Sequence, residues 1–337
     1  MFVKKLLCPL TAALVLCSCS GETDKHSASF FAMDTYMTVT AYGSGAEDAL
    51  DAVKAKVADL ESKWSVTDSS SEISKANSSG GKPVKVSPET SELVSFAVSM
   101  NEDPGMTKGA LDISLYPLLR EWGFTTSEYK VPDDSKIKEL LKNVGAGRVK
   151  VSGDELTVPD GMMIDLGAVA KGYTADLLKE ELKNRGVTSA LLDLGGNVQT
   201  VGTKPDGSLW KIGIRDPYSD GIIGTLEVGE KAVVTSGGYE RCFTENGKTY
   251  HHILDPKTGY PAESGVVSVT VVGDEGRLCD ALSTSFFVLG AEDACGIWQR
   301  EHSFDLIILT DDNKLLITEG IADSFTLSAD LKVTVVK

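Results

Sequence analysis

One stretch of the sequence, IDLGAVAKGYTAD at residues 164–176, has the residue types of a phosphate-binding loop. Lys171 lies between Gly167 and Gly172, and a helical pattern follows. The order departs from a Walker loop, in which the lysine follows the second glycine, and from the G-x-G-x-x-G of dinucleotide folds. Backbone N–H groups at a helix start nevertheless favour an anion, to which Lys171 would add a positive charge. These residues alone leave two interpretations open, a phosphate site and a structural strand–turn–helix.

Histidines gather in a second stretch, YHHILDPKTGYP at residues 250–261. His251 and His252 are two of the four histidines in the chain. In a strand their side chains point to opposite faces, so we expect only one of them to face a site. Histidine is the usual proton acceptor near neutral pH. The stretch predicts either a general base or a structural histidine beside a turn, since DPKTGYP is rich in turn-forming residues.

Oxygen-bearing side chains have helical spacing in a third stretch, CDALSTSFFVLG at residues 279–290. Asp280, Ser283 and Thr284 stand at i, i+3 and i+4, which gathers their oxygens on one side of a helix. One carboxylate with hydroxyl groups suits Mg²⁺ that is also held by the phosphates of a substrate. The alternative is structural, with Asp280 as the N-cap of this helix.

A fourth stretch, GALDISLYPLLREWGF at residues 109–124, places Asp112 beside small and apolar residues. Its carboxylate could bind a ligand hydroxyl or a ring nitrogen. It could equally cap the turn that follows.

The helices that would position these residues follow from apolar periodicity. Leu50, Val53, Val57, Leu60 and Trp64 repeat at helical spacing. The helix that follows the 164–172 turn should end at Gly186, a natural C′ residue. We expect further helices over 89–101, 134–143 and about 280–299, a short strand at the start of 164–172, and a long polar loop over 68–83.

The second half of the chain is rich in strand-like segments without an internal repeat or an obvious linker. We therefore predict an α+β fold, a single large domain with a largely antiparallel sheet and flanking helices. The expected strands are TYMTVTAYG, SALLDL, LWKIGIR, KAVVTSG, GVVSVTVVG, DLIILTD, KLLITEG and KVTVV.

The N-terminus has the pattern of a bacterial targeting segment, with a positive start, an apolar run and small residues. The order Leu16-Cys17-Ser18-Cys19 resembles a lipobox, which predicts lipidation of Cys19; an ordinary secretion signal is the alternative. The predicted parts are a signal peptide at 1–18, the lipidated cysteine with a polar tether at 19–29, and a domain at 30–337.

The net charge of −16 argues against nucleic acid as a partner, because the chain could not neutralise a run of phosphates. Loss of Lys4 and Lys5 with the signal peptide would make it −16 − 2 = −18. Three cysteines, Cys242, Cys279 and Cys295, follow the targeting segment, so at least one thiol is free.

Taken in order, these motifs resemble the ApbE family of flavin transferases. The resemblance runs from Met33 to about Gly290, and nine motifs in the same order make coincidence very unlikely. The matching stretches are MDTYMTV, SEISKAN, GALDISLYPL, DLGAVAKGYTAD, LLDLGGN, WKIGIRDP, VVTSGGYER, HHILDPKTGYP and CDALSTSFFVLG.

The resemblance implies an enzyme that binds FAD as substrate with Mg²⁺ and moves the FMN half onto a Thr or Ser hydroxyl of a target protein, releasing AMP. His252 would accept the proton of that hydroxyl, and Asp280 could share the role through the metal. The FAD site would be lined by Met33, Thr67, Ala110, Leu111, Asp112, Asp165, Lys171 and Ile253. The metal ligands would be the Ala168 carbonyl, Asp280, Ser283 and Thr284.

Ser283 stands where some relatives have an acidic residue, which leaves the number of metal ions open. Two other activities use the same motifs: an Mg²⁺-dependent FAD pyrophosphatase that gives FMN and AMP, and a non-catalytic FAD-binding lipoprotein.

Acceptors in the family carry a Ser/Thr-Gly-Ala-Ser/Thr-like motif, as in subunits of membrane redox complexes. The chain itself has only SGAE at residues 44–47, which ends in Glu47 and lacks the final hydroxyl, so self-flavinylation is not expected. With the lipobox, the resemblance predicts a protein anchored by lipid to the bacterial cell membrane, facing the periplasm or the extracellular side.

Overall fold

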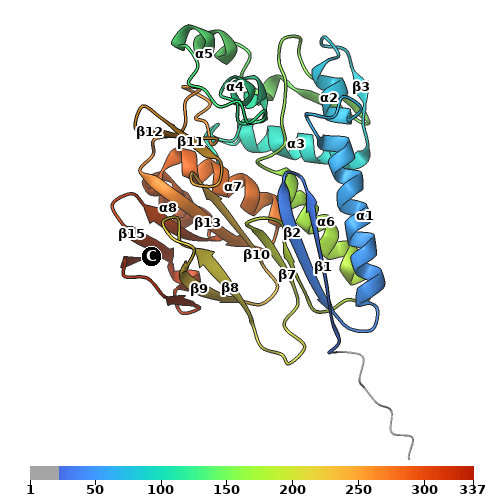
Figure 1. Ribbon diagram of the computed structural model, residues 1–337, viewed down its shortest axis with the longest axis vertical. Coiled ribbons are helices and arrows are strands. Elements are labelled where there is room, and N and C mark those ends of the chain that lie inside the picture. The colour runs from blue at the N-terminus through green and yellow to red at the C-terminus, as the bar shows by residue number, and fades with distance from the viewer. Residues whose placement is uncertain (1–22) are drawn as a thin grey trace, which may run out of the picture.

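The computed structural model describes residues 23–337, and Figure 1 shows their arrangement. The predicted signal peptide and Cys19 lie outside the described residues. The first element is strand β1 (Lys25–Ala32), which pairs with β2 (Thr35–Tyr42) along its whole length. The predicted tether at 19–29 is therefore too long, because its end belongs to the sheet. Ala28 is buried in the core there, and this apolar contact holds the segment in place.

The main sheet has nine strands in the order β1-β2-β6-β7-β10-β13-β14-β15-β17. Neighbouring strands are antiparallel except β15 and β17, which run parallel, so the predicted sheet type is confirmed. The other strands of this sheet are β6 (Ala190–Asp193), β7 (Asn197–Val201), β10 (Ala232–Gly237), β13 (Val266–Gly273), β14 (Asp305–Thr310), β15 (Lys314–Thr318) and β17 (Lys332–Val336).

Both faces of the main sheet are covered. Val233 of β10 packs against the smaller sheet β16-β9-β8, whereas its neighbour Val234 packs on the helical side. Because successive side chains of a strand point to opposite faces, this alternation produces three layers. The remaining strands are β3 (Val84–Lys85), β4 (Lys150–Ser152), β5 (Glu155–Thr157), β8 (Trp210–Arg215), β9 (Ile222–Val228), β11 (Cys242–Glu245), β12 (Lys248–His251) and β16 (Phe325–Leu327).

The helical layer consists mainly of α1, α6 and α7; α6 contacts both of the others, and all three contact the strands beneath. The helix expected over 280–299 is broken into two, because Gly290, with a φ of +90°, ends α7 and precedes α8. The helices are α1 (Ala46–Trp64), α2 (Glu72–Asn77), α3 (Pro88–Glu102), α4 (Tyr116–Glu121), α5 (Asp134–Leu141), α6 (Ala170–Asn184), α7 (Gly276–Leu289), α8 (Ala291–Glu301) and α9 (Glu319–Ala322), with 3₁₀ turns at Ile113–Leu115 and Ala146–Arg148.

Two expectations from the sequence differ from the structure. The polar segment 68–83 contains helix α2, because the Ser71 hydroxyl accepts a hydrogen bond from the N–H of Ser74 at 2.9 Å and caps it. The start of the 164–172 segment is not a strand, since its backbone pairs with a side chain rather than with a neighbouring strand.

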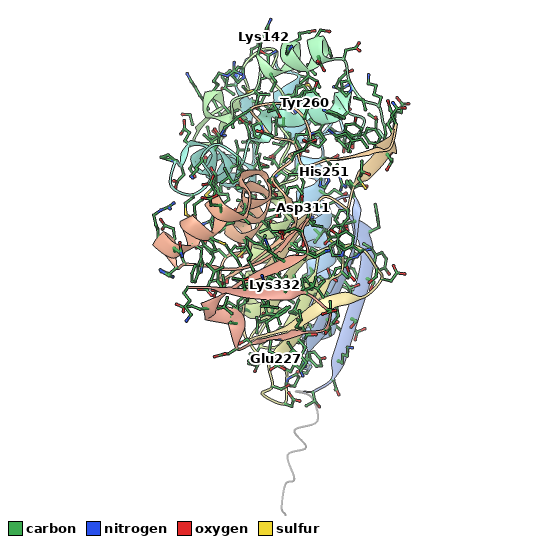
Figure 2. All side chains as sticks on the ribbon, turned by 90° about the vertical axis from the view of Figure 1, so that its left-hand side faces the viewer. Lys142, Glu227, His251, Tyr260, Asp311 and Lys332 are labelled. Atoms are coloured by element: carbon green, nitrogen blue, oxygen red, sulfur yellow. The ribbon has the colours of Figure 1, made fainter. Side chains whose placement is uncertain are left out.

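Helices α2 to α5 and the β11–β12 hairpin form the end of the molecule away from the start of β1 (Figure 1). Figure 2 places His251 below Tyr260 of this end and above Asp311, which follows a strand of the main sheet. The histidine motif therefore lies at the junction between the helical end and the sheet.

Two further properties concern residues 23–337 only. None of the helices there combines the length and the apolar character that a membrane span requires. The three cysteines in this part of the chain are all free thiols, which agrees with the expectation of at least one.

An ion pair between α1 and α3 gives the fold a pH-dependent contribution. Lys56 Nζ lies 2.8 Å from Glu89 Oε1, and Glu89 is only 24% exposed. The Lys56 hydrogen bond lowers the pKa of Glu89 to about 2, against an ordinary value of 4.5. The stabilisation is therefore complete above pH 4.5 and is lost as the pH falls towards 2. We expect Glu89→Gln to lower the free energy of unfolding by about 1–3 kcal/mol at pH 7.

Urea denaturation of both proteins at pH 7 and pH 2.5 measures this difference, which should shrink at the lower pH. Asp51→Asn is the control, because Asp51 is 79% exposed and its pair with Lys54 spans 3.5 Å. Such a pair contributes less than about 1 kcal/mol. A Glu89→Gln difference that stays constant across this pH range would contradict the assignment.

Candidate active site

The predicted phosphate loop is held by contacts from distant parts of the chain. The Asn77 amide of α2 donates to the carbonyl of Ile164 at 2.8 Å and accepts from its N–H at 2.7 Å. The N–H of Asp165 donates to the Ile113 carbonyl at 2.8 Å. Asp165 Oδ1 accepts from the N–H of Gly167 at 2.8 Å, which closes the turn before α6. The loop is thus fixed by side-chain and backbone bonds rather than by a sheet ladder.

Helices α6 and α7 meet at two glycines. A Cβ on Gly172 would lie 2.2 Å from the Gly276 carbonyl oxygen and 2.7 Å from Asp280 Cβ. The absence of side chains lets the two backbones approach, and the N–H of Gly172 donates to Asp280 Oδ2 at 2.8 Å. The helix start therefore directs a backbone donor to the carboxylate that the sequence singled out.

Asp280 does not cap its helix, so that alternative is wrong. Helix α7 begins four residues earlier, at Gly276. Its first N–H groups, those of Gly276 and Arg277, donate to the carboxylate of Asp176 on α6 at 2.7 and 2.9 Å. Because another helix supplies the cap, Asp280 lies one turn inside α7, with 4% of its surface exposed.

The predicted metal donors lie on α7 and at the start of α6. Thr284 is half-buried, and its hydroxyl lies 3.3 Å from that of Ser236 on β10. Ser283 is fully buried; its hydroxyl donates to the Asp280 carbonyl at 2.9 Å and lies 2.8 Å from that of Ser236. Ala168 precedes α6, so its carbonyl is outside the helical ladder. Asp280, Thr284 and Ala168 are thus better placed as donors than Ser283.

The donor set fits a cation that also binds substrate phosphates. Among residues 23–337 there is no group of three or more His, Cys, Asp or Glu side chains that could hold a metal ion. Mg²⁺ is commonly bound by one or two carboxylates together with phosphates and waters, rather than by an all-protein cage. One buried carboxylate with nearby hydroxyl and carbonyl oxygens meets that requirement.

His252 has a defined tautomer. Its Nδ1 lies 3.2 Å from the carbonyl oxygen of Arg241, and its backbone N–H donates to the same oxygen at 3.1 Å. A carbonyl only accepts, so Nδ1 carries the proton and Nε2 keeps its lone pair. Burial and the positive charges of Arg241 and Lys171 lower the pKa of His252 to about 3. The imidazole is therefore neutral near pH 7 and can accept a proton at Nε2.

His251 occupies a different environment, as the strand geometry predicted. Its Nε2 lies 3.1 Å from the Ala262 carbonyl, and its ring meets Phe287 edge-on at 5.2 Å between centroids. His251 is thus the structural histidine of the pair.

The electrostatic effects of Lys171 and Arg241 connect the predicted residues of three segments. Burial raises the pKa of Asp280 to about 6, against the opposing charge of Lys171. Lys171 also acts on His252, so its ammonium group lies near both. Burial likewise raises the pKa of Asp165, and the charge of Arg241 opposes it. Four predicted residues from three segments therefore converge.

Arg241 is a site residue that the sequence motifs did not single out. Its backbone carbonyl holds His252, and its guanidinium lies 3.0 Å from Asp34 Oδ2, in the turn between β1 and β2. Asn77 and Asp176 were likewise missed as positioning residues, although all three residues lie inside motifs that matched the family. Their spacing carries no signal, because each acts on a backbone far away in sequence.

The predicted FAD-lining residues are spread around this centre. Met33, Leu111 and Ile253 pack against one common apolar cluster, and Ala110 is buried beside Leu111. Thr67 is exposed, and its hydroxyl lies 3.1 Å from that of Ser65. The contact of these side chains with FAD stays a prediction.

Asp112 takes the capping role that the sequence left open. Its carboxylate accepts from the N–H of Ser114 at 2.8 Å and from the N–H of Ala146 at 3.2 Å. A contact between its carboxylate and FAD stays a prediction.

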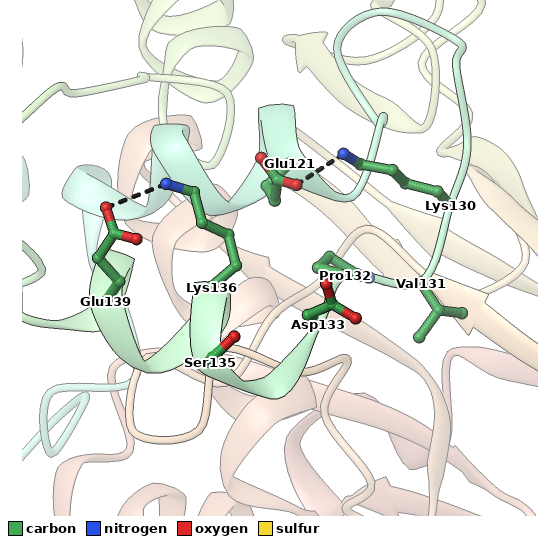
Figure 3. Close-up of a pocket in the computed structure, with 8 residues that line it drawn as sticks. All are labelled: Glu121, Lys130, Val131, Pro132, Asp133, Ser135, Lys136 and Glu139. Atoms are coloured by element: carbon green, nitrogen blue, oxygen red, sulfur yellow. Dashed lines mark hydrogen bonds and ion pairs between the residues drawn. The ribbon is translucent and has the colours of Figure 1, made fainter.

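Two surface hollows lie at the helical end. Figure 3 shows one of about 460 Å³, crossed by ion pairs from Lys130 to Glu121 at 2.6 Å and from Lys136 to Glu139 at 3.0 Å. A larger one of about 900 Å³ adjoins it and is lined in part by Met163, which precedes the predicted phosphate loop. Neither is lined by the central residues of the site, and both lysines of the first are already paired.

Fold and site together define a class of protein: a single α+β domain in which a loop-to-helix turn with a lysine, a neutral histidine and a buried carboxylate meet beside one end of a large sheet. Comparison with known protein families assigns the chain to one family. A model of the ApbE family matches residues 33–308, and the chain belongs to the ApbE family.

Individual relatives support the assignment. The chain is 34% identical over 266 residues to the FAD:protein FMN transferase of Klebsiella pneumoniae, covering 77% of this chain and 81% of the relative. The FAD:protein FMN transferase of Treponema pallidum is also 34% identical, over 262 residues and 72% of each chain. The crystal structure of the ApbE protein from Thermotoga maritima superposes with a TM-score of 0.79 at 32% identity, covering 90% of this chain and 97% of that one.

Proposed function

We propose that this protein is an FAD:protein FMN transferase, which moves the FMN moiety of FAD onto a Thr or Ser hydroxyl of an acceptor protein and releases AMP. The observation that carries the proposal is the convergence of Lys171, His252 and Asp280, in which one ammonium group acts on both a base and a buried carboxylate. Relatives at 34% identity that cover most of the chain bear the same activity in their names.

His252 accounts for the proton transfer. An acceptor hydroxyl is a poor nucleophile until a base takes its proton. Nε2 of His252 accepts that proton while the hydroxyl oxygen attacks the FMN phosphorus. The new P–O bond replaces the bond to the bridging oxygen, which leaves with AMP. Lys171 and the N-terminus of α6 supply positive charge for the pyrophosphate during this exchange.

A divalent cation fits beside these groups. Asp280, Thr284 and the Ala168 carbonyl would hold it, as the donor chemistry favours Mg²⁺. When bound, Mg²⁺ supplies charge stabilisation to the pyrophosphate and to the AMP leaving group. Gly172 keeps the Asp280 carboxylate oriented through its N–H.

The direct test incubates the protein with FAD, Mg²⁺ and an acceptor domain carrying a Ser/Thr-Gly-Ala-Ser/Thr-like motif, and reads the intact mass of the acceptor together with free AMP. Transfer predicts an FMN-sized mass gain with an equal amount of AMP, and EDTA should stop both. AMP and free FMN without labelled acceptor would identify a pyrophosphatase instead. FAD that stays bound without either product would leave a flavin carrier.

We also propose that Cys19 carries a lipid that anchors the protein to the outer side of the cell membrane, where acceptors in membrane redox complexes lie. The support is the lipobox order at residues 16–19. Cys19→Ser should move the protein from the membrane fraction to the soluble fraction and abolish labelling with a palmitate analogue. Unchanged fractionation would reject the anchor.

A further inference from the structure

Asn197, the first residue of β7, is buried without a hydrogen-bond partner. Its side chain has no exposed surface, and among the described residues neither its amide nitrogen nor its amide oxygen has a hydrogen-bond partner. Buried polar groups are normally paired, because an unpaired one loses its water without compensation. The presence of an unpaired amide in the core therefore lowers stability, which indicates that Asn197 has another role.

The strand register places this amide beneath the proposed cation site. Asn197 is the partner of Val234 on β10, and paired residues of antiparallel strands lie on the same face. Ser236 follows two residues later on that face, and its hydroxyl lies 2.8 Å from Ser283 and 3.3 Å from Thr284 of α7. Asn197 thus faces the α7 turn that begins with Asp280.

Helix α7 packs on both β7 and β10, so the buried amide of Asn197 lies under the helix that carries Asp280. Gly172 bonds to the Asp280 carboxylate from α6, through Oδ2. On the side of the sheet, the Asn197 amide is left with its hydrogen-bonding capacity unused.

We infer that Asn197 is a positioning residue, whose amide N–H, unpaired in this structure, donates to the Asp280 carboxylate when a divalent cation is bound and fixes the orientation in which that carboxylate meets the cation. The inference rests on the proposed cation site. Carboxylates that bind metals are commonly oriented by such outer hydrogen bonds, and loss of one typically weakens metal binding 10- to 100-fold. This role explains why the strand keeps an amide where an apolar side chain would pack.

Gln199 provides a matched control on the same strand. It lies two residues from Asn197, on the same face, and its side chain is also fully buried with an unpaired amide oxygen. Its amide nitrogen, however, donates to the neighbouring Thr200 carbonyl at 2.9 Å. Gln199 thus shares the burial and the amide chemistry of Asn197, but its amide nitrogen is already paired.

The experiment measures Mn²⁺ binding to the full chain by the electron paramagnetic resonance signal of free Mn²⁺. It is run with Mn²⁺ alone and with ADP, which carries the adenosine pyrophosphate half of FAD. We expect Asn197→Leu and Asn197→Ala to raise the Mn²⁺ Kd by about 10- to 100-fold, whereas Gln199→Leu keeps the wild-type Kd. Thermal unfolding identifies the variants that fold, and Asn197→Leu should keep or raise the wild-type Tm because it removes an unpaired amide.

The outcomes separate the inference from the proposal beneath it. A wild-type protein that binds no Mn²⁺ in either condition would overturn the cation site and the inference with it. Wild-type Mn²⁺ affinity in the folded Asn197 variants would overturn the inference and leave the cation site standing. If Gln199→Leu weakened Mn²⁺ binding as much as the Asn197 variants do, the effect of Asn197 would be one of packing. That result would also overturn the inference.

Discussion

His252→Ala is expected to lower kcat for flavin transfer by about 10²- to 10⁴-fold, the usual contribution of a positioned general base. The Arg241 carbonyl binds Nδ1 of His252 and leaves Nε2 as the only nitrogen that can take a proton. Alanine removes that nitrogen but leaves Lys171 and the α6 N-terminus in place. The KM for FAD should therefore change much less than kcat, which steady-state kinetics of AMP release can resolve.

His251→Ala is the matched control, since it changes the adjacent histidine. The His251 ring packs on Phe287 and bonds to the Ala262 carbonyl. Its loss should therefore lower the Tm, while kcat falls far less than in His252→Ala. Added imidazole should partly restore activity to His252→Ala, because the ring is only partly buried and a small base can enter the space that it vacates. Full activity of His252→Ala would assign the proton transfer to another group.

Gly172→Ala is expected to damage both the fold and the site. The added Cβ would lie 2.2 Å from the Gly276 carbonyl oxygen, which is backbone and cannot rotate away. Separating α6 from α7 to make room should cost about 1–3 kcal/mol of unfolding free energy. It should also weaken the bond from the Gly172 N–H to Asp280, so that AMP release falls more than the folded fraction does.

Denaturant unfolding and kinetics of the folded fraction separate these two effects. Gly296→Ala in α8 is the control, because its Cβ would meet only Arg300 Nη1 at 3.9 Å. Alanine has the higher helix propensity, so this variant should gain about 0.5–1 kcal/mol and keep wild-type activity. A Gly172→Ala protein as stable and active as the wild type would show that the α6–α7 contact is looser than it is here.

Local sequence patterns were enough to predict the helices and strands that are determined by residues close together in the sequence. The apolar repeat of α1 follows from contacts three and four residues apart, and all of its predicted apolar positions are buried. The strand-like segments became strands because their alternation or continuous apolarity suits a covered sheet, as in β13. The end of α6 was likewise predictable, since Gly186 adopts a φ of +81° that favours glycine.

The order of motifs was also enough to identify the family, and with it the residues expected at the site. The Gly172 N–H next to Lys171 bonds to Asp280, and the charge of Lys171 lowers the pKa of both His252 and Asp280; the action of these residues on FAD stays a prediction. Their identity depends on residue type and order along the chain, both of which a sequence displays directly.

Tertiary structure alone decided how those residues are held. Asn77 fixes the loop at Ile164 across 87 residues, Asp176 caps α7 across 100, and Gly172 orients Asp280 across 108. Each is a bond between a side chain and a distant backbone group, for which sequence spacing has no periodic signature. The sequence therefore left open whether Asp280 caps a helix or binds a metal, whereas the fold supplied that cap from another helix and left the carboxylate available to the site.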